Sequence, residues 1–263
     1  MRLAPVIAVL AMSGLCLPAA AVAHPLRLLA APAFVETLGP DRHRAVVITM
    51  HGGAWIASGP GAAAHERPHA RAWAARGWTV LNISYRPGRH ALGDVLWVYD
   101  RVRRHVGRHT PVCLAGSSAG GHLALMVAVR RRSVDCVVAR GAPTDLVAIH
   151  RHAAWGASGP QRLGPAQTRA WAIQAFGRRR LRAMSPARQA HRIRARVLLL
   201  NGHRDPFVPW AQQERLARAL PRAQVLRLSW GDVAWVHTSV SDAALQRAER
   251  AARAIADAAY SSS

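Results

Sequence analysis

The sequence predicts an α/β fold in which a mostly parallel central sheet is flanked by helices on both faces. The first reason is periodicity, because short apolar runs typical of buried strands alternate along the chain with longer segments of helical pattern. The second is length, since 263 residues suit one large α/β domain with its own hydrophobic core. The third is that the chain shows neither an internal repeat nor a long linker.

The first half of the chain is expected to contribute an edge strand, two further strands and two helices. The expected strands cover residues 34–38, 45–50 and 78–84. The expected helices cover residues 69–76, ended by Gly77, and 93–106. The second helix has one apolar face, formed by Val95, Leu96, Val98, Tyr99 and Val102.

The second half continues this alternation. A strand over 112–115 runs into a turn over 116–120 and a helix over 121–129. The later elements are three strands and a C-terminal helix, expected over 134–139, 196–201, 224–230 and about 241–259. Side chains that directly follow such strands are expected to converge at one edge of the sheet.

The first 23 residues have the features of a bacterial-type signal peptide. A positive start precedes an apolar stretch over 3–17 and a small-x-small cleavage site, Ala21-Val22-Ala23. We therefore expect a secreted or periplasmic protein with a mature domain over 24–263. An uncleaved membrane anchor is the alternative. Three interruptions of the apolar stretch disfavour it: Pro5, Gly14 and Pro18. No transmembrane segment is expected after the leader.

The formal net charge of +23 comes from arginine, because none of the 36 basic residues is lysine. A positive charge of this size can favour binding to nucleic acid, an acidic polymer or a membrane surface. The arginines, however, are scattered through predicted helices without interleaved aromatic residues or a recognised nucleic-acid module. We therefore expect no specific nucleic-acid partner and retain loose association with anionic surfaces.

Removal of residues 1–23 leaves two cysteines, Cys113 and Cys136, each inside a predicted strand. If those strands are neighbours, an oxidising compartment would allow a disulfide, although its geometry is demanding. The alternative is two buried thiols. From sequence we favour the thiols.

A serine at the apex of a sharp strand-to-helix turn is the candidate nucleophile. The turn is Gly116-Ser117-Ser118-Ala119-Gly120. Such a turn strains its central residue and exposes Oγ, and the strand and helix approach so closely that the flanking residues must be small. The helix N-terminus would direct its partial positive charge at an oxyanion beside Ser118. Taken alone, the pentapeptide is equally compatible with an ordinary glycine-rich turn.

A serine hydroxyl needs a neighbouring histidine and a carboxylate that orients the histidine. Asp205 follows the strand over 196–201, in a chain with only 13 acidic residues. His237 follows the last strand, and the order Ser118, Asp205, His237 is the one expected of a catalytic triad on such a sheet. Asp232 is the rival acid and is closer to His237 in sequence, but it lies outside the strand-exit position.

The oxyanion hole is predicted in His51-Gly52-Gly53-Ala54-Trp55, directly after the strand over 45–50. Adjacent glycines let the backbone bend so that amide N–H groups point into the site. Gly52 and Gly53, with Ala54 as a further candidate, would act together with the N–H of Ala119. His51 is expected to brace this loop. Most of the other histidines are expected to be solvated or to make local hydrogen bonds, and His122, although close to Ser118 in sequence, lies on the helix that follows the turn.

These residues resemble the α/β-hydrolase superfamily, in particular its H-G-G-bearing serine esterases related to hormone-sensitive lipase, acetyl esterases and kynurenine formamidases. The most specific segments are 51–55, 82–86, 116–124 and 201–209. The last segment is also similar to the acid loop of the prolyl oligopeptidase group. Two departures are Asn201, where those families often have His, and Thr238, where Gly more usually follows the histidine.

The resemblance implies an α/β-hydrolase fold with a small cap inserted over 146–184, where the alternation lapses. Its apolar residues Trp155, Trp171 and Phe176 would line an acyl or alcohol pocket, or only hold the cap together. The implied activity is that of a serine hydrolase cleaving carboxylic esters of modest size through an acyl-enzyme, without a metal or organic cofactor. The alternatives are a peptidase or amidase using the same triad, and a non-catalytic binding protein with a hydrolase fold.

Overall fold

The protein is described by a computed structural model over residues 35–40, 45–151, 164–203, 205–221, 225–229 and 254. Its strands form one seven-stranded sheet in the order β1-β3-β2-β4-β5-β6-β7. β1 pairs antiparallel with β3, and every other pair is parallel. The strands are β1 (Val35–Leu38), β2 (Val46–Met50), β3 (Thr79–Ile83), β4 (Val112–Ser117), β5 (Cys136–Arg140), β6 (Arg196–Asn201) and β7 (Val225–Ser229).

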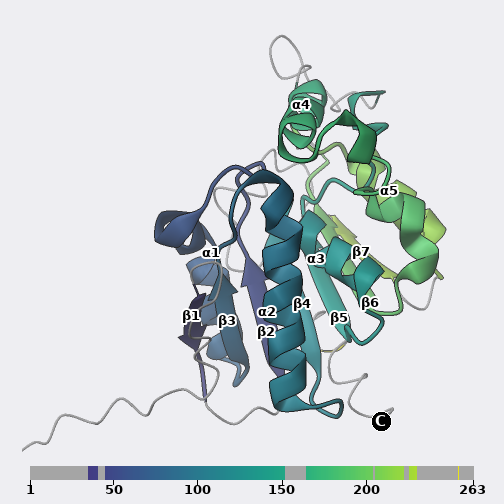
Figure 1. Cartoon of the computed structure of the whole chain (residues 1–263). Coiled ribbons are helices and arrows are strands. Elements are labelled where there is room, and N and C mark those ends of the chain that lie inside the picture. Colours follow the sequence, from purple (N-terminus) through teal and green to yellow (C-terminus); the bar gives the residue numbers. More distant parts are fainter. Residues whose placement is uncertain are drawn as a thin grey trace, which may run out of the picture.

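Helices cover both faces of this sheet (Figure 1). α2 and α3 pack on one face, where Val95 and Leu123 join Leu114 of β4 in the larger hydrophobic cluster. α1 packs on the other face, where Ala70 and Trp73 join a second cluster. This arrangement confirms the predicted fold class. The described helices are α1 (Gly59–Ala74), α2 (Ala91–Val106), α3 (Ala119–Arg130), α4 (Gly164–Phe176) and α5 (Trp210–Ala219), with short 3-10 turns η1 (Gly88–His90), η2 (Ile149–Arg151), η4 (Arg178–Arg180) and η5 (Pro186–Arg192).

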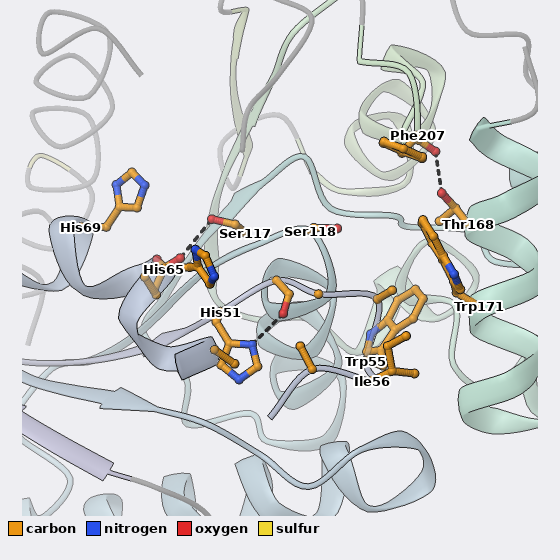
Figure 2. A pocket seen from close by; sticks show the side chains of 16 residues that line it. His51, Trp55, Ile56, His65, His69, Ser117, Ser118, Thr168, Trp171 and Phe207 are labelled. Atoms are coloured by element: carbon orange, nitrogen blue, oxygen red, sulfur yellow. Dashed lines mark hydrogen bonds between the residues drawn. The ribbon is translucent and has the colours of Figure 1, made fainter. Parts of the chain in front are cut away.

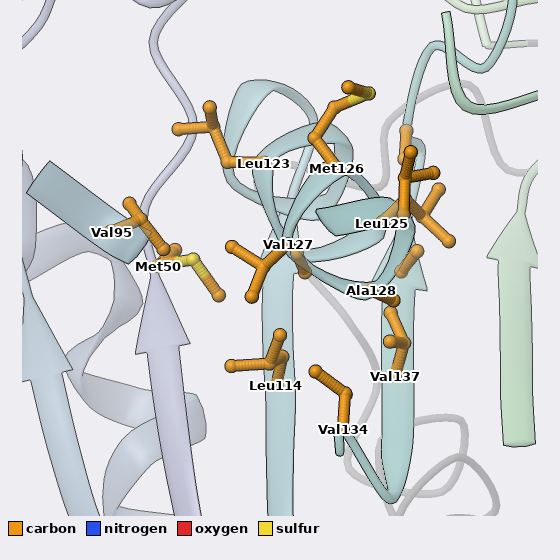
Figure 3. Close-up of a cluster of buried hydrophobic side chains, with 14 of the residues drawn as sticks. Met50, Val95, Leu114, Leu123, Leu125, Met126, Val127, Ala128, Val134 and Val137 are labelled. Carbon is orange, nitrogen blue, oxygen red and sulfur yellow. The ribbon is translucent and has the colours of Figure 1, made fainter. Parts of the chain in front are cut away.

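The central strands β2, β4 and β5 are buried along their whole length. Parallel strands covered on both faces need apolar residues in succession, which explains their nearly continuous apolar sequences. α3 is enclosed as well, since each residue from Ala119 to Val129 is buried. Figure 3 shows its side chains meeting Met50 of β2 and Leu114 of β4. The turn between β4 and α3 is therefore embedded in the core.

Polar contacts help to hold α1 on its face of the sheet. Buried Asn82 of β3 donates from Nδ2 to Ala63 O of α1 at 3.0 Å and to Glu36 Oε2 of β1 at 3.1 Å. Arg67 of α1 pairs with the same Glu36 carboxylate at 2.9 Å. Thr49 of β2 donates to Asn82 Oδ1 at 3.2 Å. These bonds satisfy buried polar groups that would otherwise oppose folding.

α1 is the element whose bounds sequence analysis predicted least well. The predicted helix covered 69–76, whereas α1 spans Gly59–Ala74. Pro60, Gly61 and Pro68 concealed its first part, because proline and glycine usually mark turns. Pro60 occupies the first turn of the helix, where the missing N–H costs nothing, and Pro68 lies on its exposed side.

Several predicted segments lie outside the described residues, namely the leader over 1–23, Trp155 and, apart from the helical Ala254, the C-terminal helix over 241–259. Part of the predicted cap is described as α4, which lies beyond the carboxyl ends of the strands (Figure 1). Among the described helices, none is long and apolar enough to cross a membrane.

The preference for two buried thiols is wrong. Cys113 of β4 and Cys136 of β5 are register partners in adjacent parallel strands, with Cα atoms 4.6 Å apart, and a disulfide joins them. Both strands were predicted from their apolar sequences. Their register depends on how the connecting helix packs, which local patterns do not reveal.

Candidate active site

Ser118 occupies the apex of the turn between β4 and α3 in a conformation that a non-glycine residue rarely adopts. Its φ is 50° and its ψ is −117°. The turn is tight enough that a Cβ on Gly116 would lie 2.6 Å from the carbonyl carbon of Gly120. Ser118 N–H donates to Arg140 O of β5 at 2.7 Å, which fixes the apex against the neighbouring strand. These are the features expected of a nucleophile elbow.

The glycine-rich loop after β2 lies directly against this turn. A Cβ on Gly52 would lie 3.4 Å from Ser118 Cβ and 3.3 Å from Ser117 O. The loop then follows an unusual path, with positive φ at Gly53 (100°), Ala54 (55°) and Trp55 (61°). Consecutive residues of this kind are held only where surrounding contacts determine the backbone. The structure thus brings the predicted oxyanion residues Gly52 and Gly53 beside Ser118.

His51 braces the base of this loop. Its Nδ1–H donates to Gly52 O at 2.6 Å, and its Nε2 accepts from Ser84 Oγ at 3.0 Å. The ring stacks on Tyr85 with centroids 4.4 Å apart, and the Tyr85 hydroxyl donates to His51 O at 2.9 Å. Burial lowers the pKa of His51, which favours the neutral ring that this bonding pattern requires.

Trp55 fixes the far end of the loop through His122 of α3. Trp55 Nε1–H donates to His122 Nδ1 at 3.1 Å, and His122 Nε2–H donates to Met184 O at 2.7 Å. Phe176 packs edge-on to Trp55 with centroids 5.3 Å apart. Burial lowers the pKa of His122 to about 4, so the imidazole is neutral at pH 7. His122 is a structural brace, and both of its nitrogens are engaged.

A pocket of about 600 Å³ opens in front of Ser118. Its aromatic wall contains Trp55, Trp171 and Phe207. Its polar wall contains His65, Glu66, His69 and Ser117. Figure 2 shows Ser118 between these two walls. Of the cap residues predicted from sequence, Trp171 lines the pocket and Phe176 instead packs behind it against Trp55.

Asp205 lies shortly after β6 and is 1% exposed. Its Oδ1 accepts from Phe207 N–H at 2.9 Å and from Val208 N–H at 2.8 Å, which fixes the carboxylate. Its Oδ2 is buried without a hydrogen-bond partner in the described part of the chain. Burial raises the pKa of Asp205 to about 6, although the two N–H donors act in the opposite direction.

The remaining predicted site residues divide into two groups. Ala119 is buried at the N-terminus of α3, directly after Ser118. His237 and the rival acid Asp232 lie outside the described residues. The structure therefore describes Ser118, the loop after β2 and Asp205 but not His237, and the catalytic roles of all of them stay predictions.

Sequence analysis missed a buried ion pair behind the nucleophile. Glu66 of α1 pairs with Arg140 of β5, and Ser117 Oγ donates to Glu66 Oε2 at 3.0 Å. A signal was present, because His65-Glu66-Arg67-Pro68-His69 has the H-E-x-x-H spacing of some zinc sites. The ion pair gives Glu66 another role, and within the described residues no group of three His, Cys, Asp or Glu side chains could hold a metal ion.

Comparison with known proteins identifies the family. The BD-FAE family model matches residues 38–220. The chain belongs to the BD-FAE family. Among curated relatives, esterase LipQ of Mycobacterium tuberculosis is 25% identical over 245 residues, covering 84% of this chain and 56% of LipQ. Hormone-sensitive lipase of Bos taurus is 33% identical over 99 residues, covering 34% of this chain and 13% of the lipase. The chain thus spans little more than half of LipQ and a small part of the lipase.

Solved structures share the fold at low sequence identity. Thermogutta terrifontis esterase 2 phosphonylated by sarin has a TM-score of 0.68 and 18% identity, covering 86% of this chain and 90% of the esterase. A hormone-sensitive lipase from a metagenome library has a TM-score of 0.63 and 17% identity, covering 81% of this chain and 77% of the lipase. These likenesses confirm the α/β-hydrolase fold, and this BD-FAE chain belongs to an esterase-type hydrolase family.

Replacing His122 by Gln should change how stability depends on pH. Burial lowers the pKa of His122 in the folded protein to about 4, below its ordinary value of 6.5. As the pH falls through about 6, His122 therefore binds a proton in the unfolded chain and stays neutral in the folded chain. Lowering the pH from 7 to 5 therefore costs the wild type about 2 kcal/mol through this group. Urea unfolding at both pH values should show that the loss is smaller by this amount in His122→Gln. Equal losses in the two proteins would contradict a buried neutral His122.

Proposed function

We propose that this protein is a serine esterase that cleaves carboxylic esters of modest size through an acyl-enzyme intermediate. The observation that carries the proposal is the position of Ser118, strained at the apex of its turn, beside Gly52 and Gly53, at a pocket of about 600 Å³. Membership of the BD-FAE family supports the same reaction class.

In the proposed mechanism, Ser118 Oγ attacks the ester carbonyl while His237 takes up its proton. The N–H groups of Gly52, Gly53 and Ala119 would stabilise the oxyanion, helped by the N-terminus of α3. His237 then returns the proton to the departing alcohol, and an activated water releases the acid by the reverse route. Each proton that leaves a nucleophile thus reaches a leaving group.

Asp205 is the proposed partner of His237. In the described part of the chain, every acidic side chain except Asp205 forms an ion pair with an arginine of the same part. Its Oδ2 is instead left buried and unbonded among the described residues. A buried acceptor needs a donor, and the Nδ1–H of a triad histidine would supply one. This pattern supports Asp205 as the acid.

Replacing Ser118 by Ala should abolish turnover of p-nitrophenyl acyl esters. Removal of Oγ leaves only the oxyanion donors and the binding pocket, so kcat should fall by roughly 10⁴-fold or more. An organophosphonate should label the wild type at Ser118 and leave Ser118→Ala unlabelled, as judged by intact mass and peptide mapping. Both proteins should show the same Tm.

Three results would contradict this proposal in different ways. Turnover by Ser118→Ala would show that another residue is the nucleophile. Absence of both turnover and labelling in the folded wild type would favour a binding protein. Faster cleavage of aminoacyl-arylamides than of esters would favour a peptidase or amidase. Matched Tm values ensure that lost activity is not lost folding.

A matched pair of variants separates the two candidate acids. Asp205→Asn keeps the side-chain shape and removes the charge that stabilises the imidazolium, so kcat should fall by about 10⁴-fold. Asp232→Asn should retain kcat within a few-fold. Steady-state kinetics on one p-nitrophenyl ester measure both. The reverse pattern would assign the acid to Asp232.

We also propose that the protein is exported and loses residues 1–23. The disulfide between Cys113 and Cys136 supports an oxidising compartment. Expression in a bacterium with a Sec pathway should yield periplasmic or secreted protein whose N-terminus is His24, as read by N-terminal sequencing. Full-length protein retained in the cytoplasm or membrane would contradict both cleavage and export.

A further inference from the structure

Glu66 is a buried carboxylate that the proposed chemistry does not use. It lies on α1, is 2% exposed, and lines the same pocket as Ser118. Its carboxylate makes two bonds, to Arg140 of β5 through Oε1 and to Ser117 of β4 through Oε2. Glu66 therefore connects a helix on one face of the sheet to the ends of two neighbouring strands.

These bonds close a ring around the apex of the turn. Ser117 Oγ donates to Glu66, the Glu66 carboxylate binds the Arg140 guanidinium, and Arg140 O accepts the Ser118 N–H at 2.7 Å. The peptide bond between Ser117 and Ser118 completes the ring. Ser117 and Arg140 are also register partners in β4 and β5. Glu66 is the member of the ring that comes from outside the sheet.

The ring of hydrogen bonds supports the strained backbone of Ser118. Ser118 has φ 50° and ψ −117°, and such a conformation persists only where the surrounding structure determines it from several sides. The Ser118 N–H and the Ser117 side chain are both fixed by members of this ring. The position of Oγ depends directly on these two residues, so a small shift of the ring would move the nucleophile.

The charges around Glu66 suit this role. Arg140 is 4% exposed, and a buried guanidinium requires a partner carboxylate. Burial raises the pKa of Glu66, whereas Arg140 and the Ser117 hydroxyl act in the opposite direction and favour the carboxylate form. His69 faces the same pair from α1; burial first and Arg140 second lower its pKa to about 2, so it stays neutral. A neutral His69 leaves Arg140 as the cation of the cluster.

We propose that Glu66 is a positioning residue for the nucleophile, which it acts on through Ser117 and Arg140 without touching the substrate carbonyl. The proposal rests on the proposed role of Ser118. It assigns to α1 a part in the reaction beyond covering the sheet. Loss of the ring should slow attack by Ser118 and leave substrate binding nearly unchanged.

The first test removes the hydrogen bond from Ser117 to Glu66 and keeps the ion pair between Glu66 and Arg140. Ser117→Ala should lower kcat roughly tenfold with KM within twofold, because misplacement of a reacting group by a fraction of an ångström slows the chemical step. The rate of organophosphonate labelling at Ser118 should fall by the same factor. Ser133→Ala is the matched control, since it removes a hydroxyl bond to Tyr99 remote from the turn. It should leave kcat and the labelling rate unchanged.

The stronger test removes the charge. Glu66→Gln should lower kcat by ten- to a hundredfold and also lower Tm, because Arg140 loses its counter-charge. Asp135→Asn is its control, since Asp135 pairs with Arg103 at the opposite ends of the strands. It should lower Tm and leave kcat per titrated active site unchanged. The double variant Ser117→Ala with Glu66→Gln should be no slower than Glu66→Gln alone, because both changes break one ring.

The outcomes separate this inference from the proposed function. Activity that survives in Ser118→Ala would overturn the proposed function itself. Full labelling rate and kcat in both Ser117→Ala and Glu66→Gln, with Ser118 still essential, would overturn the positioning role alone. Effects that multiply in the double variant would overturn action through Ser117. A rise in KM at constant kcat would instead assign Glu66 to substrate binding.

Discussion

The close approach of α3 to the carboxyl end of β2 is the constraint on which the site depends. Gly120, in the first turn of α3, faces the carbonyl oxygens of Met50 and His51 with no room for a Cβ. Because this contact is between backbones, it places the loop after β2 against the turn after β4 without relying on flexible side chains. Gly52 and Ser118 are thereby held next to each other, and the burial of α3 makes this arrangement rigid.

The backbone of the loop after β2 is supported by neutral side chains whose polar atoms are all hydrogen-bonded. His51 and His122 supply them on two sides of the loop, each with both ring nitrogens bonded and a pKa lowered by burial. A charged imidazole at His122 would add a donor where the Trp55 N–H requires an acceptor. The charged support comes instead from Glu66 and Arg140, which neutralise each other. Burial thus decides which groups behind the site carry charge.

Sequence predicted the site where a feature depends on local backbone geometry. The elbow is recognisable because Gly116 and Gly120 are required by sterics, and Asp205 was proposed because acidic residues are few in this chain and it follows a buried strand. Features that depend on packing between distant segments were missed. Glu66 and Arg140 are 74 residues apart, and no local pattern pairs them. The disulfide was misjudged for the same reason, since it follows from strand register. The start of α1 was missed because Pro60 and Pro68 suggested a turn, although Pro60 occupies the first turn of the helix, where proline is tolerated.

The exclusive use of arginine as the basic residue is compatible with this architecture because guanidinium groups can satisfy several acceptors at once. Arg103 shows how: it donates to Gly107 O, Thr110 O and Ser133 O and pairs with Asp135 at 2.6 Å, joining α2 to the ends of β4 and β5. The same property suits Arg140, since a guanidinium is more weakly hydrated than an ammonium and costs less to bury beside a carboxylate. Part of the large positive charge of the sequence therefore belongs to arginines that connect elements inside the fold. Among the arginine–glutamate pairs within the described residues, Arg140–Glu66 behind Ser118 is the most deeply buried.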